Sequence, residues 1–314
     1  MAYELEHRLV VGVASSAFFD LRESDEVFRS SGEASYREFQ ETHLDDPLEP
    51  GVAFSFIRRL LSLNDLSDPA DPLVEVIVLS RNDPDTGLRV MRSVEHHKLP
   101  ITRAVFMRGK APYKFMPALG MSLFLSSDRK SVMEAATMGL PAGRVLESSA
   151  ADDLDDPDLR IAFDFDGVLG DEASEQIFQT GGLEEFHAHE REQVETPQEP
   201  GPLKDFLAKV NLIQTKEEER ALHDPAYRIR LHVSLVTARN APAHERAIRS
   251  LKSWGVNVND AFFLGGIAKA PVITALRPHI FFDDQLLHLE TTANAAPSVH
   301  IPFGALNQEL GSTE

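Results

Sequence analysis

Short apolar runs alternate along this chain with longer amphipathic stretches. The runs at 76–79, 161–163 and 233–236 have the continuous apolar character that is typical of strands buried on both faces. Stretches with helical spacing of apolar residues follow, such as 88–97 and 243–254. Strands that alternate with helices favour an α/β fold with a parallel sheet covered by helices on both faces.

The order of these elements occurs twice. Strands at 76–82 and 233–240 both run into a polar turn that contains Arg followed by Asn, and Phe124 precedes Phe281 by 157 residues. The strand at 11–13 lies 150 residues before its counterpart in the second half. Any two α/β halves share part of such a pattern, but the matched spacing and the shared turn favour an internal duplication.

The two halves differ in the acids at their strand ends. Where the second half has Asp164, Asp166, Asp283 and Asp284, the first half has Ala14, Ser16, Ser126 and Ser127. We therefore expect one active centre, in the second half. We divide the chain into a degenerate α/β half without catalytic acids at 1–150 and a catalytic domain at 159–314, with a mostly helical cap inserted at about 170–230.

The segment from Ile161 to Gly167 carries the clearest chemistry. An apolar strand ends there in two carboxylates one residue apart, Asp164 and Asp166, and Gly167 permits a tight turn out of the strand. An unpaired buried carboxylate costs several kcal/mol, so packing alone does not explain the pair. A hard cation together with a phosphate does, because one carboxylate can attack phosphorus while the other handles a proton.

The composition argues against nucleic-acid and membrane partners. The chain has 31 Lys and Arg against 50 Asp and Glu, a formal charge of −19, which argues against a nucleic-acid-binding surface. There is no Cys, and no apolar run approaches the roughly 20 residues that cross a bilayer. We expect a cytoplasmic protein that has no nucleic-acid or membrane partner and that can form a homo-oligomer.

The strand ends of the second half together resemble the motif series of the haloacid dehalogenase-like superfamily. These are Asp164-Phe165-Asp166-Gly167-Val168, Thr237, Lys269 and Asp283-Asp284. Longer segments in both halves resemble the cytosolic 5′-nucleotidase I family. They include Val236-Thr237-Ala238-Arg239-Asn240-Ala241-Pro242, Phe281-Phe282-Asp283-Asp284-Gln285 and Ser80-Arg81-Asn82-Asp83-Pro84. One departure is Phe165-Asp166-Gly167-Val168, where animal members of the family have Gly-Asp-Ala-Val; it keeps both carboxylates and leaves the substrate preference open.

This resemblance implies a Rossmann-like parallel sheet with a helical cap, and a Mg²⁺-dependent phosphoric monoester hydrolase acting on nucleoside 5′-monophosphates, AMP above all. It implies catalytic roles for Asp164, Asp166, Thr237 and Lys269, with Asp164 as nucleophile and Asp166 as general acid–base. The implied metal-binding residues are Asp164, Asp166, Asp283 and Asp284. The implied substrate-binding residues are Thr237, Ala238, Arg239, Asn240, Lys269, Arg81 and Asn82.

Several alternatives stay open on the residues alone. Arg239 and Asn240 either contact the substrate or fix their turn, and Asp284 either binds the metal or caps the turn after its strand. The motif series does not encode the substrate. The chain is therefore also compatible with another small phosphate-ester phosphatase, a phosphomutase or a non-catalytic nucleotide-binding regulator.

Overall fold

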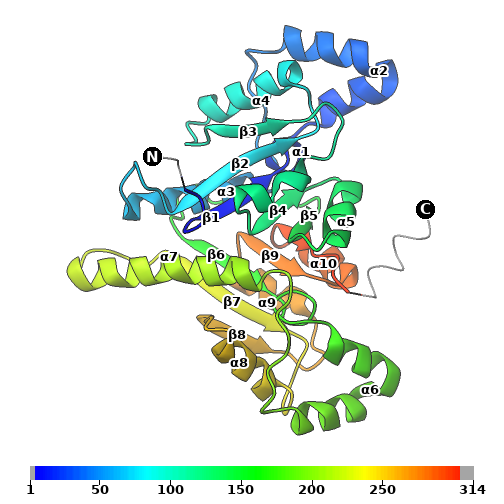
Figure 1. The fold of residues 1–314 in the computed structure, drawn as a ribbon, viewed down its shortest axis with the longest axis vertical. Coiled ribbons are helices and arrows are strands. Elements are labelled where there is room, and N and C mark those ends of the chain that lie inside the picture. The colour runs from blue at the N-terminus through cyan, green and yellow to red at the C-terminus, as the bar shows by residue number, and fades with distance from the viewer. Residues whose placement is uncertain (1–3, 305–314) are drawn as a thin grey trace.

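The computed structural model describes residues 4–304, and within them a single ten-stranded sheet runs through the whole molecule (Figure 1). The strand order is β3-β2-β1-β4-β5-β10-β9-β6-β7-β8. Neighbouring strands are parallel except β5 and β10, which pair antiparallel at the centre of the sheet. The expectation of an α/β fold with a largely parallel sheet is confirmed.

The first half supplies five strands and the helices that cover them. The strands are β1 (Leu9–Val13), β2 (Val74–Ser80), β3 (Arg103–Phe106), β4 (Leu123–Ser126) and β5 (Ala142–Val145). The helices are α1 (Ser15–Phe18), α2 (Arg22–Thr42), α3 (Phe54–Ser62), α4 (Pro84–His96) and α5 (Arg129–Thr137), with 3₁₀ turns η1 (Leu63–Leu66), η2 (Pro112–Phe115) and η3 (Pro117–Leu119).

The second half supplies the other five strands. They are β6 (Leu159–Phe163), β7 (Leu231–Thr237), β8 (Asp260–Phe263), β9 (Ile280–Asp283) and β10 (Ser298–His300). Its helices are α6 (Ala173–Glu192), α7 (Lys204–His223), α8 (His244–Ser253), α9 (Lys269–Leu276) and α10 (Leu286–Thr292). The sequence predicts helices at 171–192 and 203–222, because both stretches are long and lack internal proline, and α6 and α7 begin and end within two residues of these bounds.

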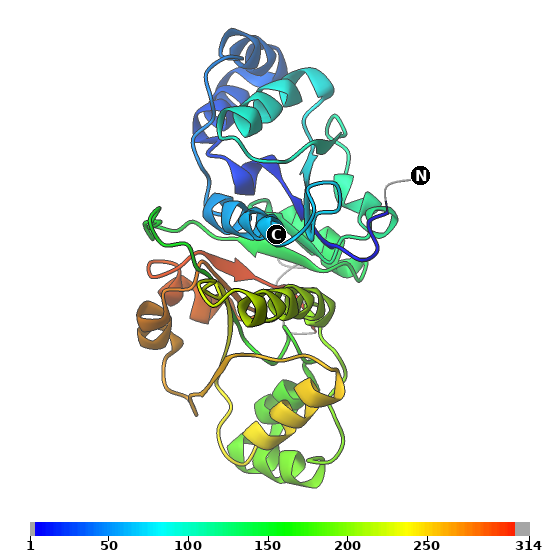
Figure 2. The ribbon, with the colours of Figure 1, turned by 90° about the vertical axis from the view of Figure 1, so that its left-hand side faces the viewer.

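The core explains why the two halves form one body. One buried apolar cluster crosses the join between them and includes residues of β1, β5, β6 and β10 beneath α3 and α7. Figure 2 shows α3 and α7 over the middle of this face. Two smaller clusters fill the opposite face, one under each half. Strands that are buried on both faces read as continuous apolar runs, which is the pattern seen at 161–163.

The two halves are related in detail as well as in topology. Each has a long helix after its first strand, α2 or α6, that is interrupted at a glycine with positive φ, Gly32 or Gly182. Side-chain bonds recur at offsets of 150 and 157 residues. They are Leu48 N to Ser93 Oγ and Gln198 N to Ser250 Oγ, both 2.9 Å, and Arg89 Nε to Asp46 O (3.0 Å) and Arg246 Nε to Thr196 O (2.8 Å). The division into a degenerate and a catalytic domain remains a prediction.

The insertion between β6 and β7 places its two helices differently. α6 extends away from the sheet at the second half's outer end (Figure 1), whereas α7 lies along the sheet and buries Phe206, Leu207 and Val210 in the shared core. Lys209 of α7 also donates to the carbonyls of Arg8 (2.9 Å) and Gly120 (3.4 Å) in the first half. α7 therefore belongs to the layer that holds the two halves together.

Candidate active site

Two adjacent strands bring the acid motifs together. β6 and β9 are parallel neighbours in which Phe163 is paired with Phe282, and the Asp164 N–H donates to the Phe282 carbonyl at 2.8 Å. Asp164 and Asp283 thus leave the carboxyl ends of neighbouring strands side by side. In open parallel sheets this edge is where ligands bind, because the loops after the strands are free to diverge there.

Lys269, the first residue of α9, lies between the two carboxylates. Its Nζ is 2.9 Å from Asp164 Oδ2 and 2.7 Å from Asp283 Oδ2. All three side chains are at most 5 % exposed, so the three charges interact with little screening by water. Burial lowers the pKa of Lys269, but Asp164 and Asp283 outweigh it and raise this pKa above its ordinary value, so the lysine stays charged.

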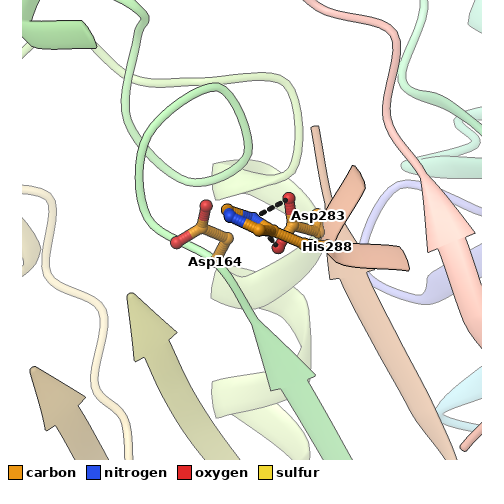
Figure 3. A group of neighbouring side chains, drawn as sticks. All are labelled: Asp164, Asp283 and His288. Atoms are coloured by element: carbon orange, nitrogen blue, oxygen red, sulfur yellow. Dashed lines mark hydrogen bonds and ion pairs between the residues drawn. The ribbon is translucent and has the colours of Figure 1, made fainter. Parts of the chain in front are cut away.

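His288 of α10 completes the group. Its Nδ1 is 3.2 Å from Asp283 Oδ2, and Figure 3 shows the imidazole beside Asp283, on the side that faces Asp164. Asp164, Asp283 and His288 each offer a ligand atom, and these atoms lie within 4.8 Å of one another, which makes them a group that could hold a metal ion. Asp164 Oδ1 is buried without a hydrogen-bond partner among residues 4–304, as expected of an oxygen that is available to a cation.

The carboxylates exceed the cations at this edge. Burial raises the pKa of Asp164 to about 6, against the opposing effect of Lys269. Burial, followed by the charges of Asp164 and Asp283, raises the pKa of Asp284 well above its usual range. For Asp283 burial acts in the same direction, but Lys269 and His288 hold its pKa below the usual range. One lysine facing three buried acids leaves negative charge that a divalent cation would neutralise.

Gly167 shapes the turn after β6. Its φ is +71°, a backbone conformation that residues with a side chain rarely adopt, and a Cβ at this position would come within 2.5 Å of Asp284 Oδ2. The absence of a side chain therefore lets the loop after β6 lie directly against Asp284. This close approach brings the two acid motifs into one site.

Asp166 faces the other way, toward β7 and α6. Arg239 donates from Nε to Asp166 Oδ2 at 2.7 Å and from Nη2 to Asp166 Oδ1 at 2.6 Å, a bidentate ion pair with both side chains largely buried. Gln198 Nε2 lies 3.4 Å from Asp166 Oδ1. In this arrangement the structure places Asp166 beside the Asp164 group and bonds both of its oxygens to protein donors.

Comparison with known proteins identifies the family of the chain. A sequence model of the 5′-nucleotidase family matches residues 1–308, nearly the entire chain. The chain belongs to the 5′-nucleotidase family. It is similar to human cytosolic 5′-nucleotidase 1B, with 31% identity over 293 residues, 91% of this chain and 47% of the relative. The chain thus spans about half the length of that relative, and no solved structure matches it.

The resemblance to the cytosolic 5′-nucleotidase I family is confirmed by these two matches. None of the helices between residues 4 and 304 is both long enough and apolar enough to cross a lipid bilayer. The roles of individual site residues in this family member remain predictions, and the structure shows which of them lie near Asp164.

Thr237 and the residues after it lie at the same edge. Thr237 ends β7 and is buried, and its Oγ1 accepts the Arg239 N–H at 3.2 Å, which leaves its own O–H free to donate. Ala238 is exposed. Asn240 Oδ1 lies 2.8 Å from His187 Nε2, so this turn is bonded to α6.

Arg81 and Asn82 are not brought to this site. They follow β2, which is separated from β6 by six strand spacings, about 29 Å along the sheet. Arg81 forms an ion pair with Glu134 of α5 at 3.6 Å, and Asn82 accepts from Tyr36 of α2 at 3.4 Å. Both contacts stay within the first half.

The structure also places three residues here that no predicted motif contains: His288, Glu190 and Gln198. His288 follows Asp283 by five residues, and a polar residue in the first turn after an acidic strand end was an available signal. Glu190 is one acid among several on an acidic helix, and Gln198 lies in an irregular Pro-rich stretch. No local pattern distinguishes either of them.

Proposed function

We propose that this protein is a Mg²⁺-dependent 5′-nucleotidase with haloacid dehalogenase-like architecture that hydrolyses nucleoside 5′-monophosphates such as AMP through an aspartyl-phosphate on Asp164. Family membership and the printed name of the human relative support the substrate class. The observation that carries the chemistry is the buried Asp164–Lys269–Asp283 group with Asp164 Oδ1 unpartnered among residues 4–304.

The first step transfers the phosphoryl group. A carboxylate oxygen of Asp164 attacks phosphorus, an Asp164 O–P bond forms and the P–O5′ bond breaks, while Asp166 delivers a proton to O5′ so that the nucleoside leaves as an alcohol. Lys269 offsets the charge of the phosphate and of the carboxylates, and the Thr237 hydroxyl is placed to donate to a phosphate oxygen.

The second step regenerates the carboxylate. Asp166, now ionised, takes a proton from water as the water attacks phosphorus. The Asp164 O–P bond then breaks and inorganic phosphate is released. Asp164, Asp283 and the backbone carbonyl of Asp166 are the groups that would hold Mg²⁺, with Asp284 and His288 beside them. When bound, the ion supplies neutralisation of the phosphate oxygens.

Phosphate release from AMP by the purified protein tests the proposal. We expect activity with Mg²⁺, loss with EDTA, and loss of at least about a thousandfold in Asp164→Asn, because the amide cannot act as the nucleophile. Asp128→Asn in the first half is a matched control, since Asp128 caps α5 through the Ser131 N–H (2.9 Å) and Asn also caps helices. This control should keep its activity.

Hydroxylamine treatment of acid-quenched wild type should release phosphate bound to Asp164, and the Asp164→Asn variant should release none. If the protein hydrolysed other phosphate esters but no nucleoside monophosphate, the proposed substrate would be wrong and the protein would be a phosphatase for another small phosphate ester. Nucleotide binding without any turnover would make the protein a regulator instead. The cytoplasmic location and a homo-oligomeric state belong to the same proposal, and fractionation and light scattering test them.

A further inference from the structure

A buried cluster of polar side chains ties the cap helix α6 to Asp166. This Arg239 cluster consists of Asp166, Glu190, Gln198, Arg239 and Arg246, and each member is at most 8 % exposed. Glu190 accepts from Arg239 Nη1 through Oε2 and from Arg246 Nη1 (2.9 Å) through Oε1, and Ser174 also donates to Oε1 (2.7 Å). The two acids and two arginines balance in charge, as buried ions must.

Arg239 has no donor left for a substrate. Its Nε and Nη2 donate to Asp166, Nη2 also donates to Gln198 Oε1 at 2.8 Å, and Nη1 donates to Glu190 and to the Ala243 carbonyl at 3.2 Å. The five N–H groups of a guanidinium are thereby all used. Its planar face lies over the rings of Phe165 (5.0 Å) and Phe186 (5.5 Å), so the side chain is held by packing as well.

The first half shows what this region needs for structure alone. Gln40 stands where the second half has Glu190, and Arg89 stands where it has Arg246; Arg89 Nη1 donates to Gln40 Oε1 at 3.4 Å. The long helix and its neighbours therefore pack without the acid and without an equivalent of Arg239, whose position holds Asn82. Glu190 and Arg239 occur together only in the half that has Asp166.

We propose that Arg239 is a positioning residue that fixes the Asp166 carboxylate for proton transfer, and that Glu190 orients Arg239 from the cap helix. This inference rests on the proposed function, because it assigns the arginine to the acid–base step of that reaction. A contact from Arg239 to one carboxylate oxygen is enough to restrict rotation of the Asp166 side chain. The other oxygen must exchange its contact with Arg239 for the proton that it delivers, within hydrogen-bond reach of the leaving oxygen. The position of α6 is thereby linked, through Glu190 and Arg239, to the orientation of the acid.

The variants Arg239→Lys and Glu190→Gln test the proposal with two leaving groups. Lysine keeps the positive charge but cannot make the bidentate contact, and glutamine in place of Glu190 reproduces the uncharged partner found in the first half. The substrates are AMP and its analogue with sulfur in place of O5′, whose thiolate leaves without needing a proton. We expect kcat/KM for AMP to fall about 10- to 100-fold in each variant, and kcat/KM for the thio analogue to change less than about threefold.

Matched controls are Gln40→Ala and Arg89→Lys, which disturb the equivalent bonds in the first half. They should leave kcat/KM unchanged for both AMP and the thio analogue. The double variant Arg239→Lys/Glu190→Gln should lose no more than the worse single variant, since the two residues act in one chain of contacts. Thermal unfolding of each variant confirms that it is folded at the assay temperature.

Equal losses on both substrates would overturn the positioning role and leave Arg239 a structural residue. A rise in KM for both substrates with kcat intact would overturn it in favour of direct substrate contact. If Glu190→Gln does not fold, Arg239→Lys alone decides between these results. Absence of turnover in the wild-type protein would refute the proposed function, an outcome distinct from failure of this inference.

Discussion

Lys269 carries a prediction that joins the stability of the site to its chemistry. Replacing it by Met keeps the length and apolar stem of the side chain but removes the ammonium between Asp164 and Asp283. Those carboxylates are 5 % and 0 % exposed, so water cannot take over the lost contacts of 2.9 and 2.7 Å. Removing one partner of a buried ion pair costs about 3–5 kcal/mol, because the other charge stays buried and uncompensated.

The cost should depend on pH and on Mg²⁺. Without the ammonium, the pKa of Asp164, already raised to about 6 by burial, rises further. A folded-state pKa above the unfolded value means that the folded variant takes up protons as the pH falls, so its deficit is largest near pH 8 and shrinks toward pH 5. Mg²⁺ binding to the folded state should recover part of the deficit, in proportion to ligand concentration.

Urea unfolding in EDTA measures the effect. Trp254 is the chain's one tryptophan and stacks on Phe165 at 6.0 Å, so its fluorescence reports unfolding close to the site. Lys209→Met is the matched control, because it loses hydrogen bonds to two neutral carbonyls and leaves no buried charge without a partner. We expect this variant to lose about 1–3 kcal/mol of unfolding free energy. A Lys269→Met deficit no larger than the control's, or one independent of pH, would refute the claim that the Lys269 ammonium offsets the buried charge of Asp164 and Asp283.

Two further predictions concern single positions. Burial, with Arg59 and Arg160 next, lowers the pKa of His279 to about 3, and its Nδ1 accepts the Arg160 N–H at 3.0 Å. Stability should therefore fall as the pH drops below about 6.5, by about 2 kcal/mol at pH 5, and His279→Gln should flatten this slope in urea titrations; an unchanged slope would count against it. Gly167→Ala should abolish phosphatase activity by displacing Asp284, whereas Gly255→Ala, with a similar φ of +68° and open space at Cβ, should only lower the melting temperature. Equal activity of these two variants would contradict the close-approach argument.

The parts of the site that follow from local chemistry were predictable. An apolar strand that ends in Asp164-Phe165-Asp166-Gly167 predicts two carboxylates at a sheet edge, and a second strand end at Asp283 predicts the partner for the same ion. Those predictions need only the rule that parallel strands present their carboxyl ends together. Lys269 was expected here from its order in the motif series, and the structure puts its Nζ within 2.9 Å of both acids.

Contacts made across the fold could not be predicted in this way. Arg239 reads equally as a substrate contact or a turn residue, and its five bonds depend on where Glu190 and Gln198 come to lie, 49 and 41 residues away. Arg81 is followed by Asn82 just as Arg239 is followed by Asn240, so the two arginines look alike in the sequence. Arg81 nevertheless lies about 29 Å along the sheet from β6, because it follows β2 in the first half.

The sequence by itself determined the class of the fold, the twofold recurrence of its elements and the acids that gather at one edge of the sheet. These properties depend on periodicity and residue type, which act within a few residues. Only the tertiary structure decided that the two halves share one sheet through the antiparallel pair β5 and β10. These strands have four and three residues, too few for a hydrophobic pattern to predict them. Such short strands gain their stability from the neighbours that cover them, and those neighbours are fixed only when the whole chain has folded.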